Sequence, residues 1–156
     1  MILYFAYGSN LDWGQMKNRC PSALFVDTAL LPKHRLAFTW MSSSRQCGVA
    51  DVVFDENEDV WGSVYQINQC DLETLDRCEG FQSGRARNAY IRVEKTVFAQ
   101  GNTGNPLKVM IYVVQEKEEN HIPPSREYLD LIVEGARYWH LPENYVDCIE
   151  KTGAEG

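Results

Sequence analysis

The residues best placed for chemistry form a polar turn directly after the first apolar run of the chain: Tyr7, Gly8, Ser9 and Asn10. Residues 2–7 predict a buried strand, and a helix-compatible stretch begins at residue 11. Gly8 lets a ligand approach the backbone closely, while Ser9 and Asn10 are favoured helix caps. Such a junction leaves backbone N–H groups free to hold a carboxylate or a phosphate. A tight turn without function is the alternative, because four residues are weak evidence.

Glu79 is the strongest candidate for an acid–base group. Residues 71–79 predict a helix of about two turns that ends at Gly80. The helix dipole disfavours an anion at this C-terminal end, and the apolar neighbours Leu75 and Phe81 remove water from it. Both effects raise the pKa of the carboxyl group, which suits a general base near neutral pH. The alternative is a solvated glutamate at a helix end, because most glutamates are exposed.

Other patterns for metal binding or nucleophilic catalysis are missing from the sequence. The histidines, His34, His121 and His140, fall in different predicted elements and form no His-x-x-x-His pair, so no metal site is predicted. Ser9 has no Gly-x-Ser-x-Gly frame, which argues against a serine nucleophile. Cys78 is interpreted as a small buried residue rather than as a nucleophile. We therefore expect no metal site and no side-chain nucleophile.

The roles of three further polar residues, Asp51, Tyr112 and Tyr128, are ambiguous from the sequence. Asp51 interrupts an apolar strand, so it either lines a pocket with a polar partner or lies on the outward face of a half-exposed strand. Tyr112 and Tyr128 fit the usual pattern of a core tyrosine with its hydroxyl group at a rim. The residues alone do not decide between these roles.

Composition narrows the class of protein. The chain has 156 residues, of which 44% are hydrophobic and 24% charged, as expected for a globular protein. The net charge of −7 and the scattered basic residues argue against nucleic acid or an anionic membrane as the main partner. No signal peptide or membrane span is visible. The five cysteines contain no Cys-x-x-Cys pair, which predicts reduced, mostly buried thiols in a cytoplasmic protein.

The order of predicted elements favours an α+β fold in one domain. We expect five or six strands, three or four helices, a domain over residues 1–150 and a flexible tail over 151–156. A strand is predicted at 34–40, a hairpin at 48–54 and 60–67 through the acidic turn 55–59, and a second hairpin at 88–99 and 107–114. Helices are predicted at 11–19, 71–79, 126–140 and 141–149, with Ser125 as a cap.

Five blocks of sequence together carry a family resemblance. They are residues 4–11 (Tyr-Phe-Ala-Tyr-Gly-Ser-Asn-Leu), 59–67, 75–80 (Leu-Asp-Arg-Cys-Glu-Gly), 123–128 and 135–142. Each block is modest alone, but their order along most of the chain is fairly specific. In these blocks the chain resembles the gamma-glutamyl cyclotransferase-like family, also called AIG2-like.

The resemblance implies a fold and a site. It implies a small closed β-barrel with helices packed outside and a pocket at one end. In that fold Glu79 is the catalytic glutamate, and the substrate is held by Tyr7, Gly8, Ser9 and Asn10, with Tyr112 and Tyr128 lining or closing the pocket. The stretch 83–90 departs from the family by being longer and more basic. Its Arg85 and Arg87 either contact a leaving group or are surface charges.

The resemblance also implies a reaction without a cofactor. The α-amine of a gamma-glutamyl amide attacks its own γ-carbonyl, and 5-oxoproline and a free amine are released. The family leaves that amine open: an amino acid, a lysine-type amine, or an aminoglycoside as in the assembly of the antibiotic butirosin. Two alternatives stay open, namely an amide hydrolase that uses the same pocket and a non-catalytic domain that binds a small acidic metabolite. No sequence feature indicates an oligomeric state.

Overall fold

A closed barrel of strands forms the centre of the molecule. The computed structural model describes residues 1–154. Its strands are β1 (Ile2–Ala6), β2 (Leu24–Ser42), β3 (Cys47–Ile67), β4 (Tyr90–Ala99) and β5 (Pro106–Val114). They close in the order β1-β3-β2-β4-β5, with β1 antiparallel to β3 and parallel to β5. The barrel expected from the family resemblance is confirmed, and its interior is filled by apolar residues such as Phe5, Val64 and Ile111.

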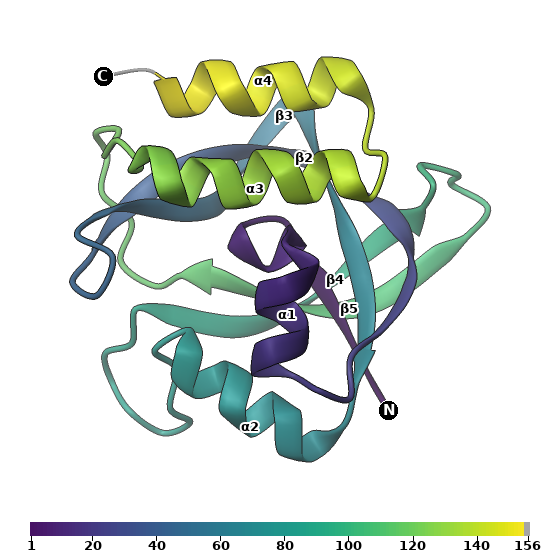
Figure 1. Cartoon of the computed structure of the whole chain (residues 1–156), viewed down its shortest axis with the longest axis horizontal. Helices are drawn as coiled ribbons and strands as arrows, with labels where there is room; N and C mark the ends of the chain where they lie inside the picture. Colours follow the sequence, from purple (N-terminus) through teal and green to yellow (C-terminus); the bar gives the residue numbers. More distant parts are fainter. Residues whose placement is uncertain (155–156) are drawn as a thin grey trace.

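The helices cover the outside of the barrel (Figure 1). They are the 3-10 turn η1 (Ser9–Leu11), α1 (Trp13–Arg19), α2 (Gln69–Cys78), α3 (Arg126–Tyr138) and α4 (Glu143–Ala154). In Figure 1, α3 and α4 lie side by side at one end of the molecule, and α2 lies at the other end. Ser125 caps α3, as expected, because its hydroxyl accepts from the N–H of Tyr128 at 3.1 Å.

The first predicted hairpin is wrong. Strand β3 is continuous through the acidic segment, and its partner is β2, which begins ten residues before the predicted strand at 34–40. Residues 55–58 form a large bulge opposite Lys33, between the paired residues His34–Phe54 and Pro32–Asp59. A bulge takes residues out of the ladder and leaves their charged side chains in water, so its composition resembles that of a turn. The reversal lies at 43–46 instead, where Gln46 has a φ of 56°.

The second predicted hairpin is confirmed. Strands β4 and β5 pair antiparallel from Tyr90 opposite Val114 to Phe98 opposite Pro106. Residues 100–105 connect them, and Gly101 there has a φ of 73°, a conformation that glycine adopts without strain. The pattern of Gly, Asn and Pro between two alternating segments therefore predicts this element correctly.

Two other expectations differ from the structure. Helix α4 continues to Ala154 and buries Gly153, so residues 151–154 of the expected flexible tail are helical, while 155–156 lie outside the described residues. The thiols are not mostly buried: Cys20 and Cys47 are, whereas Cys70, Cys78 and Cys148 are exposed. Cys78 is exposed because it lies in the last turn of α2, next to an open cavity.

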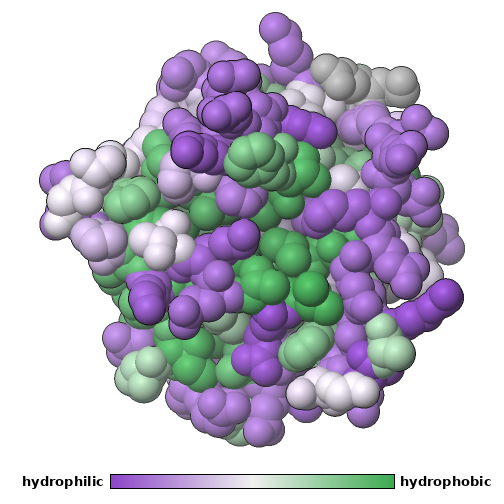
Figure 2. Space-filling view, turned by 180° about the vertical axis from the view of Figure 1, so that it is seen from behind, coloured by the Kyte–Doolittle hydropathy of each residue, from purple (hydrophilic) through white to green (hydrophobic). Residues whose placement is uncertain are grey.

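The surface combines apolar and charged regions. Figure 2 shows the face opposite to that of Figure 1, where hydrophobic side chains gather at the centre among hydrophilic ones. Among residues 1–154, no helix has the length and hydrophobicity of a membrane span.

Candidate active site

The polar turn after β1 forms one wall of the candidate site. The chain leaves the barrel at Ala6 and tightens into η1, where the N–H groups of Leu11 and Asp12 donate to the carbonyls of Gly8 and Ser9 at 3.0 Å. The expected capping role of Ser9 and Asn10 is wrong, because Asp12 caps α1 by accepting from the N–H of Gln15 at 2.9 Å. Ser9 and Asn10 are buried within η1. Because neither side chain caps a helix, both can contact groups of the site.

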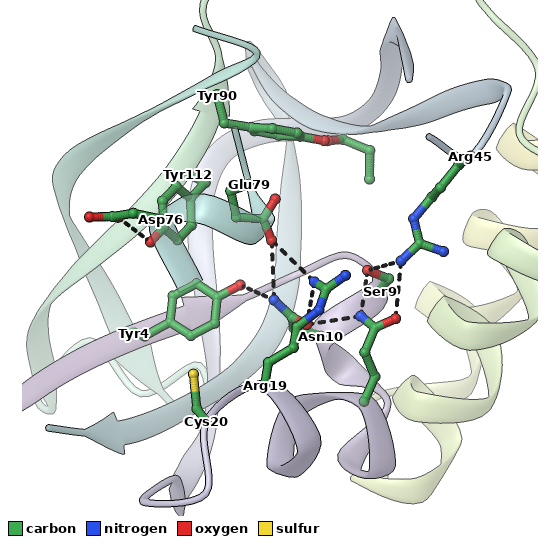
Figure 3. Close-up of polar contacts among 12 residues, drawn as sticks. Tyr4, Ser9, Asn10, Arg19, Cys20, Arg45, Asp76, Glu79, Tyr90 and Tyr112 are labelled. Atoms are coloured by element: carbon green, nitrogen blue, oxygen red, sulfur yellow. Dashed lines mark hydrogen bonds and ion pairs between the residues drawn. The ribbon is translucent and has the colours of Figure 1, made fainter. Parts of the chain in front are cut away.

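Glu79 faces this turn from the end of α2. Its N–H still donates to the carbonyl of Leu75 at 2.9 Å, and Gly80 follows with a φ of 68°, as the predicted helix end requires. Glu79 Oε1 accepts a hydrogen bond from Asn10 Nδ2 at 3.2 Å and lies 3.7 Å from Nη1 of Arg19 (Figure 3). The carboxylate and the polar turn, 69 residues apart in the chain, are therefore in direct contact.

Burial raises the pKa of Glu79. Its side chain is only 16% exposed, and loss of water raises the pKa above the usual value of a glutamate. The charges of Arg19 and Arg45 and the hydrogen bond from Asn10 act in the opposite direction but do not cancel the effect of burial. The predicted direction is confirmed, with burial as its main cause. A raised pKa brings a carboxyl group closer to the range in which it serves as a general acid or base.

A small inner cavity lies between the turn and Glu79. Its volume is about 30 Å³, and Gly8, Ser9, Asn10 and Glu79 are on its wall. Most of the remaining lining consists of tyrosines, namely Tyr4, Tyr7, Tyr90, Tyr112 and Tyr128. Burial raises the pKa of each of these phenols, so they stay neutral. All seven predicted site residues thus line one cavity.

Hydrogen bonds fix the tyrosines in place. The hydroxyl of Tyr7 donates to the carbonyl of Tyr112 at 2.6 Å, and that of Tyr112 donates to Asp76 Oδ1 at 2.6 Å. The hydroxyl of Tyr128 accepts from the N–H of Ala50 at 2.9 Å. Each of these hydroxyls already has a protein partner, so the rings act as rigid walls of the cavity.

A larger outer cavity shares part of this wall. Its volume is about 260 Å³, and Ser9, Glu79, Tyr90 and Tyr128 line both cavities. Arginines from three elements or loops surround it: Arg19, Arg45 and Arg77. Glu79 lies where the two cavities meet, so it can reach a reacting group that spans them.

The sequence pattern did not reveal several residues of the site. Tyr4 and Tyr90 line the inner cavity, and Gln15 donates to Ser9 Oγ at 2.8 Å and to Asn10 Oδ1 at 2.9 Å. Arg19 and Arg45 were also missed. The only usable signal was the position of Tyr4 in the same block as the polar turn. The other contacts join segments that are distant in sequence.

Asp51, Arg85 and Arg87 lie outside both cavities. Asp51 is fully buried and accepts hydrogen bonds from Thr39 Oγ1 at 2.8 Å and from Lys117 Nζ at 2.6 Å, so the half-exposed reading is wrong and it lines neither cavity. Arg85 donates to the carbonyl of Gly80 at 2.9 Å, and Arg87 is an exposed side chain 3.7 Å from Glu116. Arg85 and Arg87 are surface charges with local partners.

No metal site accompanies this arrangement. Among residues 1–154, no three His, Cys, Asp or Glu side chains are grouped as ligands of a metal ion would be. What the geometry offers is a buried carboxylate, a turn of backbone N–H groups and a cavity between them. Such a set can transfer protons and hold an anion.

Comparison with known proteins places the chain in a family. Residues 59–149 match the AIG2-like family. The chain is 34% identical over 167 residues to the gamma-glutamylcyclotransferase of Bos taurus, covering 99% of this chain and 82% of that protein, and 34% identical over 158 residues to that of Homo sapiens, covering 96% and 77%.

Solved structures agree with this result. A structure of a gamma-glutamyl cyclotransferase superposes with a TM-score of 0.84 at 30% identity, covering 96% of this chain and 86% of that one. A structure of an uncharacterised human protein gives 0.83 at 32% identity with the same coverage. The chain therefore belongs to the AIG2-like, or gamma-glutamyl cyclotransferase, family.

Proposed function

We propose that this protein is a gamma-glutamyl cyclotransferase that converts a gamma-glutamyl amide into 5-oxoproline and a free amine. One observation carries the proposal: the carboxylate of Glu79 faces the turn 8–10 across a cavity, and Asn10 links the two at 3.2 Å. Similarity over nearly the whole chain to proteins named gamma-glutamylcyclotransferase supports the proposal.

The substrate brings its own nucleophile, so the protein needs to supply position and proton transfer. Folding the glutamyl group brings the α-nitrogen onto the γ-carbonyl carbon and closes a five-membered ring. Holding the two ends in this geometry contributes several kcal/mol to catalysis. The tyrosine walls around the inner cavity are rigid enough for that task.

Glu79 carries a proton from the attacking nitrogen to the leaving nitrogen. Its carboxylate takes a proton from the α-ammonium group, which frees the nitrogen lone pair to attack the carbonyl carbon. The resulting carboxylic acid then donates a proton to the leaving nitrogen as the amide bond breaks. The ring nitrogen gives its remaining extra proton to the released amine, which leaves as an ammonium ion, and Glu79 returns to its carboxylate form. Such acid–base catalysis is worth about 10²- to 10⁴-fold.

The turn 8–10 holds the anionic part of the substrate. Among the hydrogen bonds of residues 1–154, none uses the backbone N–H groups of Gly8, Ser9 or Asn10 as donors. These groups suit the α-carboxylate or the oxyanion that forms on the γ-carbonyl oxygen. A side chain at position 8 would be crowded, because a Cβ there would lie 3.3 Å from Cβ of Ala50.

The proposal is tested by mass-spectrometric detection of 5-oxoproline from a panel of gamma-glutamyl amides. The panel contains dipeptides, gamma-glutamyl-lysine and a gamma-glutamylated aminoglycoside. Glu79→Gln is expected to lower kcat by at least about 10²-fold while the protein stays folded. Glu73→Gln is the matched control, because Glu73 is an exposed residue of the same helix outside both cavities and should keep full activity.

Other outcomes separate the alternatives. Release of free glutamate in place of 5-oxoproline would indicate an amide hydrolase. Ligand-induced stabilisation without turnover of any panel member would indicate a binding domain. Near-normal 5-oxoproline release by Glu79→Gln would refute the assigned role of Glu79.

A further inference from the structure

Arg45 occupies a specific place at the entrance to the site. It comes from the reversal between β2 and β3, and its Nη2 donates to Gln15 Oε1 at 3.0 Å and contacts Ser9 Oγ at 3.5 Å. Its guanidinium carbon lies 4.8 Å from the centre of the Tyr128 ring. These contacts hold the guanidinium group at the outer cavity (Figure 3).

The donors of Arg45 are only partly used. Within residues 1–154, Nε and Nη1 of Arg45 make no hydrogen bond, and Arg45 forms no ion pair. A guanidinium group carries five N–H donors in a fixed fork that matches a carboxylate. Arg45 therefore presents an unpaired charge and free donors beside the cavity.

The rest of the outer cavity has the same sign of charge. Glu79 is its only carboxylate among the lining residues, and Arg19 lies 3.7 Å from that group. Arg77 donates to Thr74 Oγ1 at 3.2 Å and, like Arg45, has no acidic partner between residues 1 and 154. Although the whole chain is acidic, this cavity is locally basic and disfavours a cationic occupant.

Resting on the proposed function, we propose that Arg45 is a specificity-determining residue that binds a carboxylate on the leaving amine. Glu79 must reach the leaving nitrogen and lies where the cavities meet, so the amine beyond that nitrogen extends into the outer cavity. A carboxylate there meets the free face of Arg45. Aminoglycosides and other polycations are then poor leaving groups.

The test compares two substrates that differ only in this charge: gamma-glutamyl-alanine and gamma-glutamyl-alaninamide. The wild type is expected to favour the acid in kcat/KM by about tenfold or more, as for a hydrogen bond to a charged group. The carboxamide makes alaninamide the less basic and chemically better leaving amine, so leaving-group chemistry predicts the opposite preference.

Variants assign the effect to Arg45. Arg45→Gln should bring the ratio of the two kcat/KM values close to one, mainly by raising KM for the acid, and Arg45→Lys should restore part of it. Arg87→Gln is the matched control, because Arg87 is an exposed arginine outside the cavity and its removal should leave the ratio unchanged. A purely structural role of Arg45 would lower both rates equally and keep the ratio.

The outcomes separate this inference from the proposed function. Release of 5-oxoproline from both substrates with a wild-type ratio near one would overturn the role of Arg45 and leave the cyclotransferase activity intact. An unchanged ratio of the two kcat/KM values in Arg45→Gln would overturn it as well. If the ratio fell only in Arg77→Gln, the role would belong to Arg77. No 5-oxoproline from either substrate would count against the proposed function itself.

Discussion

Asn10 holds Glu79 from the opposite side of the site. Its Nδ2 donates to Glu79 Oε1 at 3.2 Å and to the hydroxyl of Tyr4 at 3.0 Å, while its Oδ1 accepts from Gln15 at 2.9 Å and from Arg19 at 3.2 Å. One amide thus orients the carboxylate and lowers its pKa. The polar turn is a support for Glu79 as well as a candidate anion site.

Removing this amide should change the pH dependence of the reaction. The hydrogen bond from Asn10 lowers the pKa of Glu79, so Asn10→Ala raises that pKa further. The base form of Glu79 is then lost at a higher pH, and the acid limb of the kcat/KM profile moves to higher pH. We also expect kcat/KM on its plateau to fall about tenfold, as for loss of a hydrogen bond to a charged group.

A pH–rate profile of Asn10→Ala beside the wild type checks this expectation. Asn18→Ala is the control, because Asn18 is exposed on α1 and lines neither cavity. An acid limb at the same or lower pH in Asn10→Ala would contradict the link between Asn10 and Glu79.

The ionised side chain of Glu79 should lower the free energy of unfolding at neutral pH. Burial raises its folded-state pKa, so the folded protein binds this proton more tightly than the unfolded chain does. The stability linked to the neutral acid is complete below the unfolded pKa and is lost as pH rises through the folded pKa. Glu79→Gln should therefore raise the free energy of unfolding at pH 7 by about 0.5–2 kcal/mol, or a few degrees in Tm.

Thermal unfolding at two pH values tests the sign. The gain from Glu79→Gln should be largest near pH 7 and shrink in acid, where the glutamate is already protonated. A variant that is less stable than the wild type at pH 7 would mean that the attraction of Arg19 and Arg45 outweighs burial.

The fold was predictable where the sequence pattern is local. The helix ending at Gly80 and the β4–β5 hairpin follow from periodicity and turn residues over short spans. The start of β2 has no alternating signal in the sequence, because Leu24, Phe25 and Val26 are consecutive apolar residues and all three are exposed in the structure. The acidic segment of β3 has the composition of a turn, because a bulge and a turn both leave charged residues in water.

The site was predictable only in part for a related reason. Glu79 and the turn 7–10 each have a local signal, but closure of the barrel was implied by family resemblance and not by the pattern. Arg45 and Arg19 reach Glu79 only after β2 and β3 pair and α1 packs beside the turn. No spacing along the chain indicates those contacts.

Helix α3 packs directly on the turn of the site, which makes Gly135 sensitive to substitution. A Cβ at Gly135 would overlap the backbone carbonyl group of Leu11 and lie 2.7 Å from the N atom of Asp12. Gly135→Ala should lower the free energy of unfolding by about 1–3 kcal/mol and shift the turn 9–12 away from Glu79.

Chemical denaturation and activity assays of Gly135→Ala test both effects. Gly14→Ala in α1 is the opposite case, because its Cβ would meet only Asp12 Oδ2 at 3.4 Å. Helix propensity predicts a gain of up to about 1 kcal/mol there. Equal free energies of unfolding for Gly135→Ala and Gly14→Ala would show that α3 can move away from the turn without loss of stability.

The buried Asp51 should depend on its cationic partner, Lys117. Asp51 is 0% exposed and accepts from Lys117 Nζ at 2.6 Å, Thr39 Oγ1 at 2.8 Å and the N–H of Val114 at 3.0 Å. Lys117→Gln leaves this charge without a counterion. Because Lys117 is 38% exposed, solvent screens part of the loss, so we expect about 1–3 kcal/mol rather than the full cost of breaking a buried pair.

The same change should reach the site through the backbone next to Asp51. The N–H of Ala50 donates to the hydroxyl of Tyr128, and its carbonyl accepts from the hydroxyl of Tyr90. Displacement of this strand would loosen both cavity walls, so kcat should fall along with stability in Lys117→Gln. Lys108→Gln is the control, since Lys108 is 78% exposed and only 3.9 Å from the exposed Glu94, a pair worth little. Equal unfolding free energies for the two variants, measured by urea titration, would show that Thr39 and Val114 alone satisfy Asp51.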